Sequence, residues 1–332
     1  EPLLHTHLVT DAPVQLYALL FIPAKGERGI FSLRREDGLK LYSRNILIDE
    51  YNKDLLPEYF RFVQGVVDSE DLPLNVSRET VQSSGLMQKL KKVLTNQLFK
   101  ELEALSKNAP EKYIAFWQEF GGYLKQGVAV DHLEAPKLIP LLRFKTTLRS
   151  EEWSSLDELI SRLPENQKLI YYIIGEDPRS ILRSPHLDYF QSQGIEVLLL
   201  TEPIDSFMLM GLRQYKNYEF NNVAQADVKP VEPPADQTQA QNIIEADFAA
   251  LVARFKQTLT DRVADVRGSH RLTQSVARLV DPDDALEPEL QRVYRYLGKE
   301  YEVPRKILEI TPAHPILKNL LRLPPGSDLQ TL

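Results

Sequence analysis

The apolar residues near the start of the chain follow the pattern of strands. Residues 14–22 are rich in branched and aromatic side chains and are followed at once by a proline, which predicts a buried strand. Two further strands are predicted over residues 30–34 and 39–48, joined by a turn that ends in glycine. Apolar residues at helical spacing predict a short helix over residues 55–63. The chain therefore opens with a mainly antiparallel sheet.

The apolar pattern then changes to the period of helices. Leucine and valine recur at helical spacing between residues 86 and 105, which predicts one long amphipathic helix. A second helix over residues 111–120 carries an aromatic stripe, and such a stripe is typical of a core rather than of a ligand site. A shorter helical segment is predicted over residues 136–144.

Two continuous apolar runs, residues 169–174 and 195–200, are separated by a predicted helix over residues 180–191. This order predicts a parallel βαβ unit with a right-handed crossover, whose strands are covered on both faces. The chain contains neither of the glycine-rich motifs that bind nucleotide phosphates, so we interpret the turn at Gly175 as structural.

A change of composition divides the chain. Residues 218–242 contain three prolines and few apolar side chains, which predicts a linker between two domains. The first domain is expected over residues 1–217 and the second over residues 243–332, with a strand over 262–267 and helices over 248–259 and 286–297. Together these elements predict a mixed α/β (α+β) fold class.

Composition and charge exclude several classes of function. The 332 residues are 43% hydrophobic and 26% charged, as in a globular chain with two or more cores, and the net charge of −7 gives no broad attraction to nucleic acid or anionic lipid. The chain has no cysteine, which excludes disulfides and thiol catalysis and is typical of a reducing compartment. No apolar run reaches the roughly 18 residues of a membrane span. The six histidines occur in no metal-binding motif, so we expect no metal site.

The most informative stretch covers residues 66–82, where an apolar strand leads into an acidic turn, a proline and the start of a helix. Asn75 and Ser77 are both residues that cap helix N-termini, which places Arg78 at the mouth of the helix. Gln82 lies four positions later and shares a helix face with Arg78. Asn75, Arg78 and Gln82 could converge on one ligand. The alternative is an ordinary capped helix with a solvated arginine.

A second candidate site lies near residue 208. The chain has three methionines, and two of them, Met208 and Met210, lie beside Phe207. Core packing explains such a cluster because methionine fills irregular gaps. The competing interpretation is an adaptable apolar surface that binds many partners.

The run from residue 67 to residue 79, Val-Asp-Ser-Glu-Asp-Leu-Pro-Leu-Asn-Val-Ser-Arg-Glu, resembles the signature loop of the heat-shock protein 90 chaperone family, its bacterial high-temperature protein G members included. The resemblance extends over nearly the whole chain, and further matching text lies at 41–48, 56–59, 167–176, 261–267 and 308–315. It implies a middle domain followed by a truncated C-terminal domain. The middle domain would comprise a large part of the ribosomal-S5-domain-2 type over residues 1–125 and a helical connector with a small βαβ part over residues 126–217.

The resemblance also implies roles for the candidate residues. Arg78 would be the catalytic-loop arginine that reaches the γ-phosphate of ATP, with Gln82 and Asn75 assisting it. ATP and Mg²⁺ would be held by an N-terminal domain absent from these residues, so this chain alone is expected neither to hydrolyse ATP nor to bind it tightly. A guanidinium supplied from another domain stabilises the charge that develops on the transferred phosphoryl group.

The resemblance further implies partners and a location. Unfolded or partly folded client proteins would bind, with Phe207, Met208 and Met210 near the cleft that faces them, and the full-length protein would be a cytoplasmic homodimer. This chain ends at Leu332, before the family's dimer helices, and looks like an excised piece, so we expect a monomer. We expect neither nucleic acid nor a membrane as a partner.

Two other classes of function compete with this interpretation. The chain could be a passive interaction module in which Arg78 only lies beside a helix cap. It could also be related to ATP-gated topoisomerases or mismatch-repair proteins, whose second domains share the architecture but use a lysine at the corresponding place. The presence of Arg78 in its full signature, without a basic stripe for DNA, argues against the second alternative.

Overall fold

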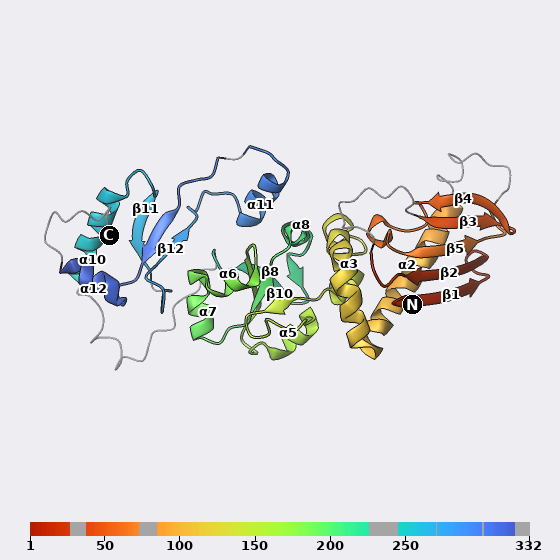
Figure 1. The fold of residues 1–332 in the computed structure, drawn as a ribbon, viewed down its shortest axis with the longest axis horizontal. Coiled ribbons are helices and arrows are strands. Elements are labelled where there is room, and N and C mark those ends of the chain that lie inside the picture. The colour runs from red at the N-terminus through yellow and green to blue at the C-terminus, as the bar shows by residue number, and fades with distance from the viewer. Residues whose placement is uncertain (27–37, 73–84, 226–244, 270, 301, 323–332) are drawn as a thin grey trace. The chain divides into compact units, whose positions relative to one another are not determined.

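The structure is a computed structural model, drawn in Figure 1, and it describes residues 1–26, 38–72, 85–225, 245–269, 271–300 and 302–322. The chain forms two compact units. Unit 1 contains Glu1–Arg143, Trp153–Arg162 and Phe207–Leu212, and unit 2 contains Phe144–Glu152, Leu163–Ser206 and Arg213–Leu332. Both units combine helices with sheets, so the mixed α and β class predicted from the sequence is confirmed.

Unit 1 is built on a five-stranded sheet with the strand order β1-β2-β5-β3-β4. Neighbouring strands are antiparallel except β3 and β5, which are parallel. Burial alternates along β2, where every second side chain from Leu16 to Ile22 is buried, because successive side chains of a strand point to opposite faces. The strands are β1 (Leu4–Thr10), β2 (Leu16–Ile22), β3 (Leu39–Ser43), β4 (Ile46–Asn52) and β5 (Gln64–Asp68).

Two long helices complete the core of unit 1. The helices α2 (Gly85–Asn108) and α3 (Pro110–Val130) contact each other, and α2 also contacts β1. Aromatic rings fill the space between the elements: Phe62 stacks on Phe120 with ring centroids 4.7 Å apart, and Phe60 meets Phe99 edge to face at 5.2 Å. The shorter elements of this unit are η1 (Glu58–Phe60), α4 (Ala135–Leu138), η2 (Ile139–Leu141) and α5 (Leu156–Arg162).

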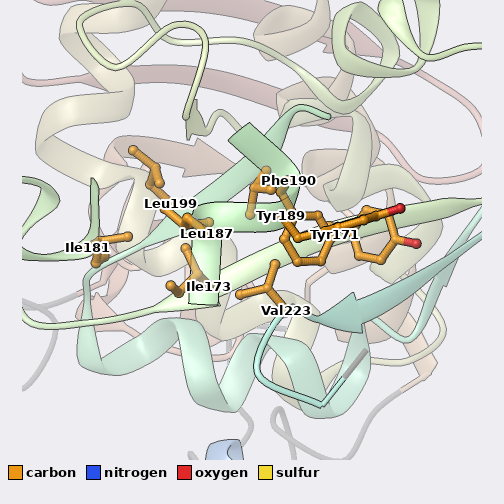
Figure 2. Packing of buried hydrophobic residues seen from close by; sticks show 9 residues of the cluster. Tyr171, Ile173, Ile181, Leu187, Tyr189, Phe190, Leu199 and Val223 are labelled. Carbon is orange, nitrogen blue, oxygen red and sulfur yellow. The ribbon is translucent and has the colours of Figure 1, made fainter. Parts of the chain in front are cut away.

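The first sheet of unit 2 contains the βαβ unit. Its strand order is β6-β8-β7-β10-β9, and the central strand β7 is parallel to both β8 and β10. Figure 2 shows its apolar core, in which Tyr171 of β7 meets Phe190 edge to face and Val223 lies close by. The elements are β6 (Lys145–Thr146), β7 (Leu169–Ile174), α6 (Pro178–Leu182), η3 (Pro185–Leu187), α7 (Asp188–Ser192), β8 (Val197–Leu200), β9 (Gln214–Tyr215) and β10 (Tyr218–Asn222).

The second sheet of unit 2 has three strands in the order β11-β13-β12. The strand β13 is parallel to β11 and antiparallel to β12. Its core is a separate apolar cluster around Leu251, Val266, Ile310 and Leu317. The elements are α10 (Glu245–Thr258), β11 (Asp265–Gly268), β12 (Ala277–Val280), α11 (Pro288–Tyr296), β13 (Ile307–Ile310) and α12 (Pro315–Leu321).

Polar contacts join these two cores of unit 2. The buried carboxylate of Asp188 in α7 accepts hydrogen bonds from the backbone N–H groups of Thr273, Gln274 and Ser275 at 3.3, 3.0 and 2.6 Å. Arg271 donates a 2.9 Å hydrogen bond to the backbone carbonyl of Val223. Contacts of this kind require exact geometry but bury little apolar surface, which is typical of joints between domains.

The structure corrects several predicted elements in unit 1. The strand predicted over residues 39–48 is a hairpin, because Arg44 and Asn45 adopt positive φ angles of 49° and 64° and reverse the chain between β3 and β4. The helix predicted over residues 55–63 is only the three-residue turn η1. The strand β1 was not predicted at all. The strand predicted over residues 30–34 lies outside the described residues.

Unit 2 holds two further differences. The helix predicted over residues 180–191 is divided into α6, η3 and α7 because Pro185 cannot continue an α-helix. Residues 218–222, which we placed in the linker, form β10 and pair with β7. Most of the rest of that linker, residues 226–244, lies outside the described residues. The predicted domain boundaries therefore stay a prediction.

Candidate functional site

The residues predicted to act on ATP, Asn75, Arg78 and Gln82, lie in residues 73–84 and so outside the described part of the chain. The structure does describe both ends of this segment, which for brevity we call the signature loop (residues 73–84). It follows β5 and the short stretch from Ser69 to Leu72, and it precedes α2, which begins at Gly85. The signature loop therefore connects Leu72, which follows the end of β5, to the start of α2 at Gly85.

Four hydrogen bonds fix the end of β5 that leads into the signature loop. The buried hydroxyl of Ser69 donates to the backbone carbonyl of Gln15 at 2.6 Å, and the backbone N–H of Gln15 donates to the carboxylate of Asp71 at 2.8 Å. The buried hydroxyl of Ser43 donates to the carbonyl of Leu72 at 2.6 Å. The backbone N–H of Ser69 donates to the carbonyl of Tyr42 at 3.2 Å.

These contacts give the acidic turn a structural role. Asp68 also takes part, because its carboxylate accepts a hydrogen bond from the backbone N–H of Asn45 at 3.0 Å. Residues 68–72 are therefore held by hydrogen bonds to the β3–β4 hairpin and to Gln15, which directly precedes β2. The chain therefore enters the signature loop from a fixed point on the sheet.

A hollow of about 630 Å³ lies beside this entrance. Its polar lining carries both signs of charge, with Arg44 opposed by Asp68 and Glu70. Its apolar lining comes from neighbouring strands of the sheet, including Tyr17, Leu19 and Val66. Because its charges are mixed, this hollow is not a strongly positive pocket of the kind that attracts phosphate.

The structure separates the members of the predicted client-binding segment. Phe207, Met208 and Met210 lie on α8 (Pro203–Gly211). The side chain of Met208 has no exposed surface, Phe207 is half-buried, and Met210 is 47% exposed. The buried Met208 fits the core-packing alternative, and Met210 is the member that a partner can reach. Binding of clients at this segment stays a prediction.

A charged cluster in unit 2 was missed by the sequence reasoning. Glu309 of β13 lies between Arg267 of β11 and Arg278 of β12, with N–O distances of 2.8 and 2.6 Å. Burial alone would raise the pKa of Glu309, but the two guanidinium groups outweigh it and hold that pKa below its usual value. Only the register of three strands distant in sequence brings these groups together, so no local pattern could have indicated the cluster.

His186 of η3 lies near this cluster. Burial lowers the pKa of His186 to about 4, and the positive charges of Arg278 and Arg271 act in the same direction. His186 is therefore neutral at pH 7. Its Nδ1 is buried and has no hydrogen-bond partner among the described residues.

The described residues contain neither a candidate metal site nor a candidate membrane-spanning helix. Across those residues, no three histidine or acidic side chains come together as a metal site would require. The described helices likewise include none with the length and apolar character needed to cross a bilayer.

Comparisons with known proteins agree on one family. The sequence model described as Hsp90 protein matches residues 1–326. The chaperone protein HtpG of Nitratidesulfovibrio vulgaris is 41% identical over 331 residues, which cover 97% of this chain and 52% of that protein. The HtpG proteins of Chlorobaculum tepidum and Treponema denticola are 40% and 34% identical over 96% of this chain and 51% of their own lengths. The chain thus spans about half the length of the curated relatives it matches.

Proposed function

Because the chain belongs to the Hsp90 family, we propose that it forms the part of an ATP-dependent chaperone that supplies an arginine to ATP bound by another domain and offers surface to unfolded polypeptides. Arg78 is the proposed arginine, with Gln82 and Asn75 assisting it. The observation that carries this proposal is the family's signature run, which leaves the sheet at a point fixed by Ser69 and Asp71.

In ATP hydrolysis, the proposed role of this chain is to contribute one arginine to a site that another domain builds. In phosphoryl transfer, charge is spread over the oxygens of the transferred group, and a correctly placed guanidinium stabilises it. An arginine supplied from another domain can be worth roughly 10³ in rate, and less where its role is mainly conformational. ATP and Mg²⁺ would be bound by the N-terminal domain, and Arg78 would complete that site when the two domains meet.

The test is an ATPase assay in which this chain is added to a separately produced N-terminal domain of an HtpG relative. We expect turnover to rise with the intact chain. With Arg78→Ala we expect no rise, while the affinity of the N-terminal domain for ATP stays the same. Arg179→Ala is the matched control, because Arg179 is an exposed arginine of unit 2, far in sequence from the signature loop. Equal stimulation by the intact chain and Arg78→Ala would remove Arg78 from the mechanism.

The rival function is a passive interaction module. Exposed apolar side chains in unit 1, such as Tyr17, Leu19 and Met210, favour it because they could hold a partner without nucleotide. Suppression of client aggregation by this chain, with no effect on the ATPase of the N-terminal domain, would support the module and contradict the motor role. We further propose a cytoplasmic location, a homodimer for the full-length protein and a monomer for this chain.

A further inference from the structure

The strand β1 forms one edge of the five-stranded sheet, next to β2 (Figure 1). It is seven residues long, and its pairing with β2 runs without a register shift from Leu4 to Thr10. Its sequence, Leu-His-Thr-His-Leu-Val-Thr, contains no lysine, acidic residue, proline or glycine. Every second residue of an edge strand turns its N–H and C=O groups away from its partner, where they can pair with another chain.

The other sheet edges in the described residues are protected by devices that β1 lacks. The opposite edge strand, β4, carries Asp49 and Glu50, and its pairing with β3 contains register shifts. In the first sheet of unit 2, the edge strands β6 and β9 have only two residues each. In the second, the four-residue edge strands β11 and β12 carry Asp265, Arg267 and Arg278. Short length, charges and bulges all discourage the addition of a strand, so β1 differs from the rest.

The side chains beside this edge suit an extended apolar segment. Across the sheet, Val66 is paired with Leu19 and Leu19 with His7, and these three side chains form a row that ends at the open edge. Val9 and Tyr17 form the neighbouring pair, and they are 52% and 42% exposed. The hollow of about 630 Å³ lies over part of this surface. A strand added next to β1 would place every second side chain at the end of these rows.

We propose that β1 accepts an extended apolar polypeptide segment as an additional antiparallel or parallel strand. The inference rests on the proposed chaperone function, because an unfolded client is the partner that presents such segments. Main-chain hydrogen bonds would give affinity for many sequences, and the exposed apolar rows would favour segments with apolar residues at alternate positions. The strand β1 contains no lysine, arginine or acidic residue, so binding is expected to depend little on salt.

The probe is a fluorescent peptide of about ten residues, long enough to cover the strand, in which valine and threonine alternate between two terminal lysines. We expect Val9→Lys to weaken its binding by about tenfold, equivalent to about 1.4 kcal/mol, because a lysine on an edge strand discourages pairing. The matched control is Ile46→Lys on β4, since Ile46 is 54% exposed and lies at the other edge. We expect this control to bind the peptide as the unchanged chain does. Thermal unfolding verifies that both variants fold.

A second probe separates strand pairing from adhesion to an apolar face. The same peptide with every backbone amide N-methylated keeps its side chains but can donate no main-chain hydrogen bond along either edge. We expect it not to bind, and we expect the unmethylated peptide to slow hydrogen exchange of backbone amides in residues 4–10. Equal binding of the methylated peptide, or no added protection in β1, would overturn the inference.

Two further outcomes are informative. If the chain dimerises and Val9→Lys makes it monomeric, the partner of the edge is a second copy of the chain, and the inference is overturned. Suppression of client aggregation that is equal in the intact chain and in Val9→Lys would also overturn it, but would leave the proposed chaperone function standing. Failure of the intact chain both to suppress aggregation and to stimulate the N-terminal ATPase would instead contradict the proposed function.

Discussion

The phenol of Tyr172 donates a 2.6 Å hydrogen bond to the carboxylate of Glu289, which lies 117 positions later in the chain. The side-chain amide of Asn222 donates to the same carboxylate oxygen at 2.7 Å. Burial raises the pKa of Tyr172, and the charge of Glu289 raises it further, so the phenol is protonated and donates at neutral pH. Glu289 thus fastens the first turn of α11 to the parallel strands β7 and β10.

This contact predicts a graded loss of stability on substitution of Glu289. Glu289→Gln keeps an acceptor but loses the charge, and we expect the free energy of unfolding to fall by about 1 kcal/mol. Glu289→Ala leaves two buried donors without an acceptor, and we expect a loss of about 2 kcal/mol or more. Urea denaturation measures both changes. Combining Glu289→Gln with Tyr172→Phe in a double-mutant cycle would isolate the pair, and additive losses would contradict a direct contact.

The control for this series is Glu287→Gln, since Glu287 is an exposed carboxylate two residues before Glu289. We expect little change in stability from that substitution. Hydrogen exchange offers a second measurement, because the amides of α11 should exchange faster in Glu289→Ala. Unchanged exchange in α11 would show that other contacts hold this helix.

The pKa of His186 predicts that the protein loses stability in mild acid. Burial lowers that pKa to about 4, whereas an unfolded histidine titrates near 6.5, so between these values only the unfolded chain binds the proton. Stability must therefore fall as the pH falls through this range. We expect a loss of about 2 kcal/mol between pH 7 and pH 5 from this group alone. Urea midpoints at the two pH values measure it.

A neutral replacement tests the assignment to His186. His186→Asn cannot take up a proton, so its stability should depend less on pH than that of the unchanged chain. The nearby charges that set the pKa are Arg278, Arg271 and Lys306, which lower it, and Glu309, which raises it. His132→Asn, at an exposed histidine, is the control and should keep the original pH dependence. Equal pH dependence in His186→Asn and the unchanged chain would refute the assignment.

Local patterns in the sequence predicted the elements with strong periodicity. The leucines of α2 and the apolar runs of β7 and β8 are examples, because the spacing of apolar residues that predicts them lies within a single element. The strand β1 was missed because only one of its faces is buried, through Leu4 and Thr6, and threonine gives a weak apolar signal. The hairpin turn at Arg44 and Asn45 was missed because it contains neither glycine nor proline.

Contacts between distant segments could not be predicted from the sequence. Asp188 and the turn at Thr273 are 85 positions apart, and nothing local to either indicates the other. The candidate site differs, because the resemblance of residues 67–79 made Arg78 a candidate without any geometry. The structure adds the fixed entrance built by Ser43, Ser69 and Asp71, whose hydrogen-bond partners lie far from them in the sequence.

Close backbone packing at the end of α8 gives a prediction for unit 1. A Cβ atom on Gly211 would lie 2.2 Å from the backbone carbonyl oxygen of Val128, and a backbone atom in a helix cannot easily move away. We therefore expect Gly211→Ala to lower the free energy of unfolding by about 1–3 kcal/mol. Gly85→Ala is the control, because a Cβ there meets no atom of the described residues within 4 Å. Thermal unfolding compares the two, and equal melting temperatures would contradict the close approach.

The two methionines of α8 should respond differently to substitution, because Met208 is fully buried and Met210 is 47% exposed. Met208→Ala removes core contacts, and we expect a loss of about 2–5 kcal/mol in the free energy of unfolding. Met210→Ser should leave stability nearly unchanged. If α8 contacts clients, Met210→Ser should weaken the suppression of client aggregation in a light-scattering assay. The control is Leu133→Ser, because Leu133 is 90% exposed. Equal suppression by Met210→Ser, Leu133→Ser and the unchanged chain would exclude α8 as a client contact and leave its methionines with a packing role alone.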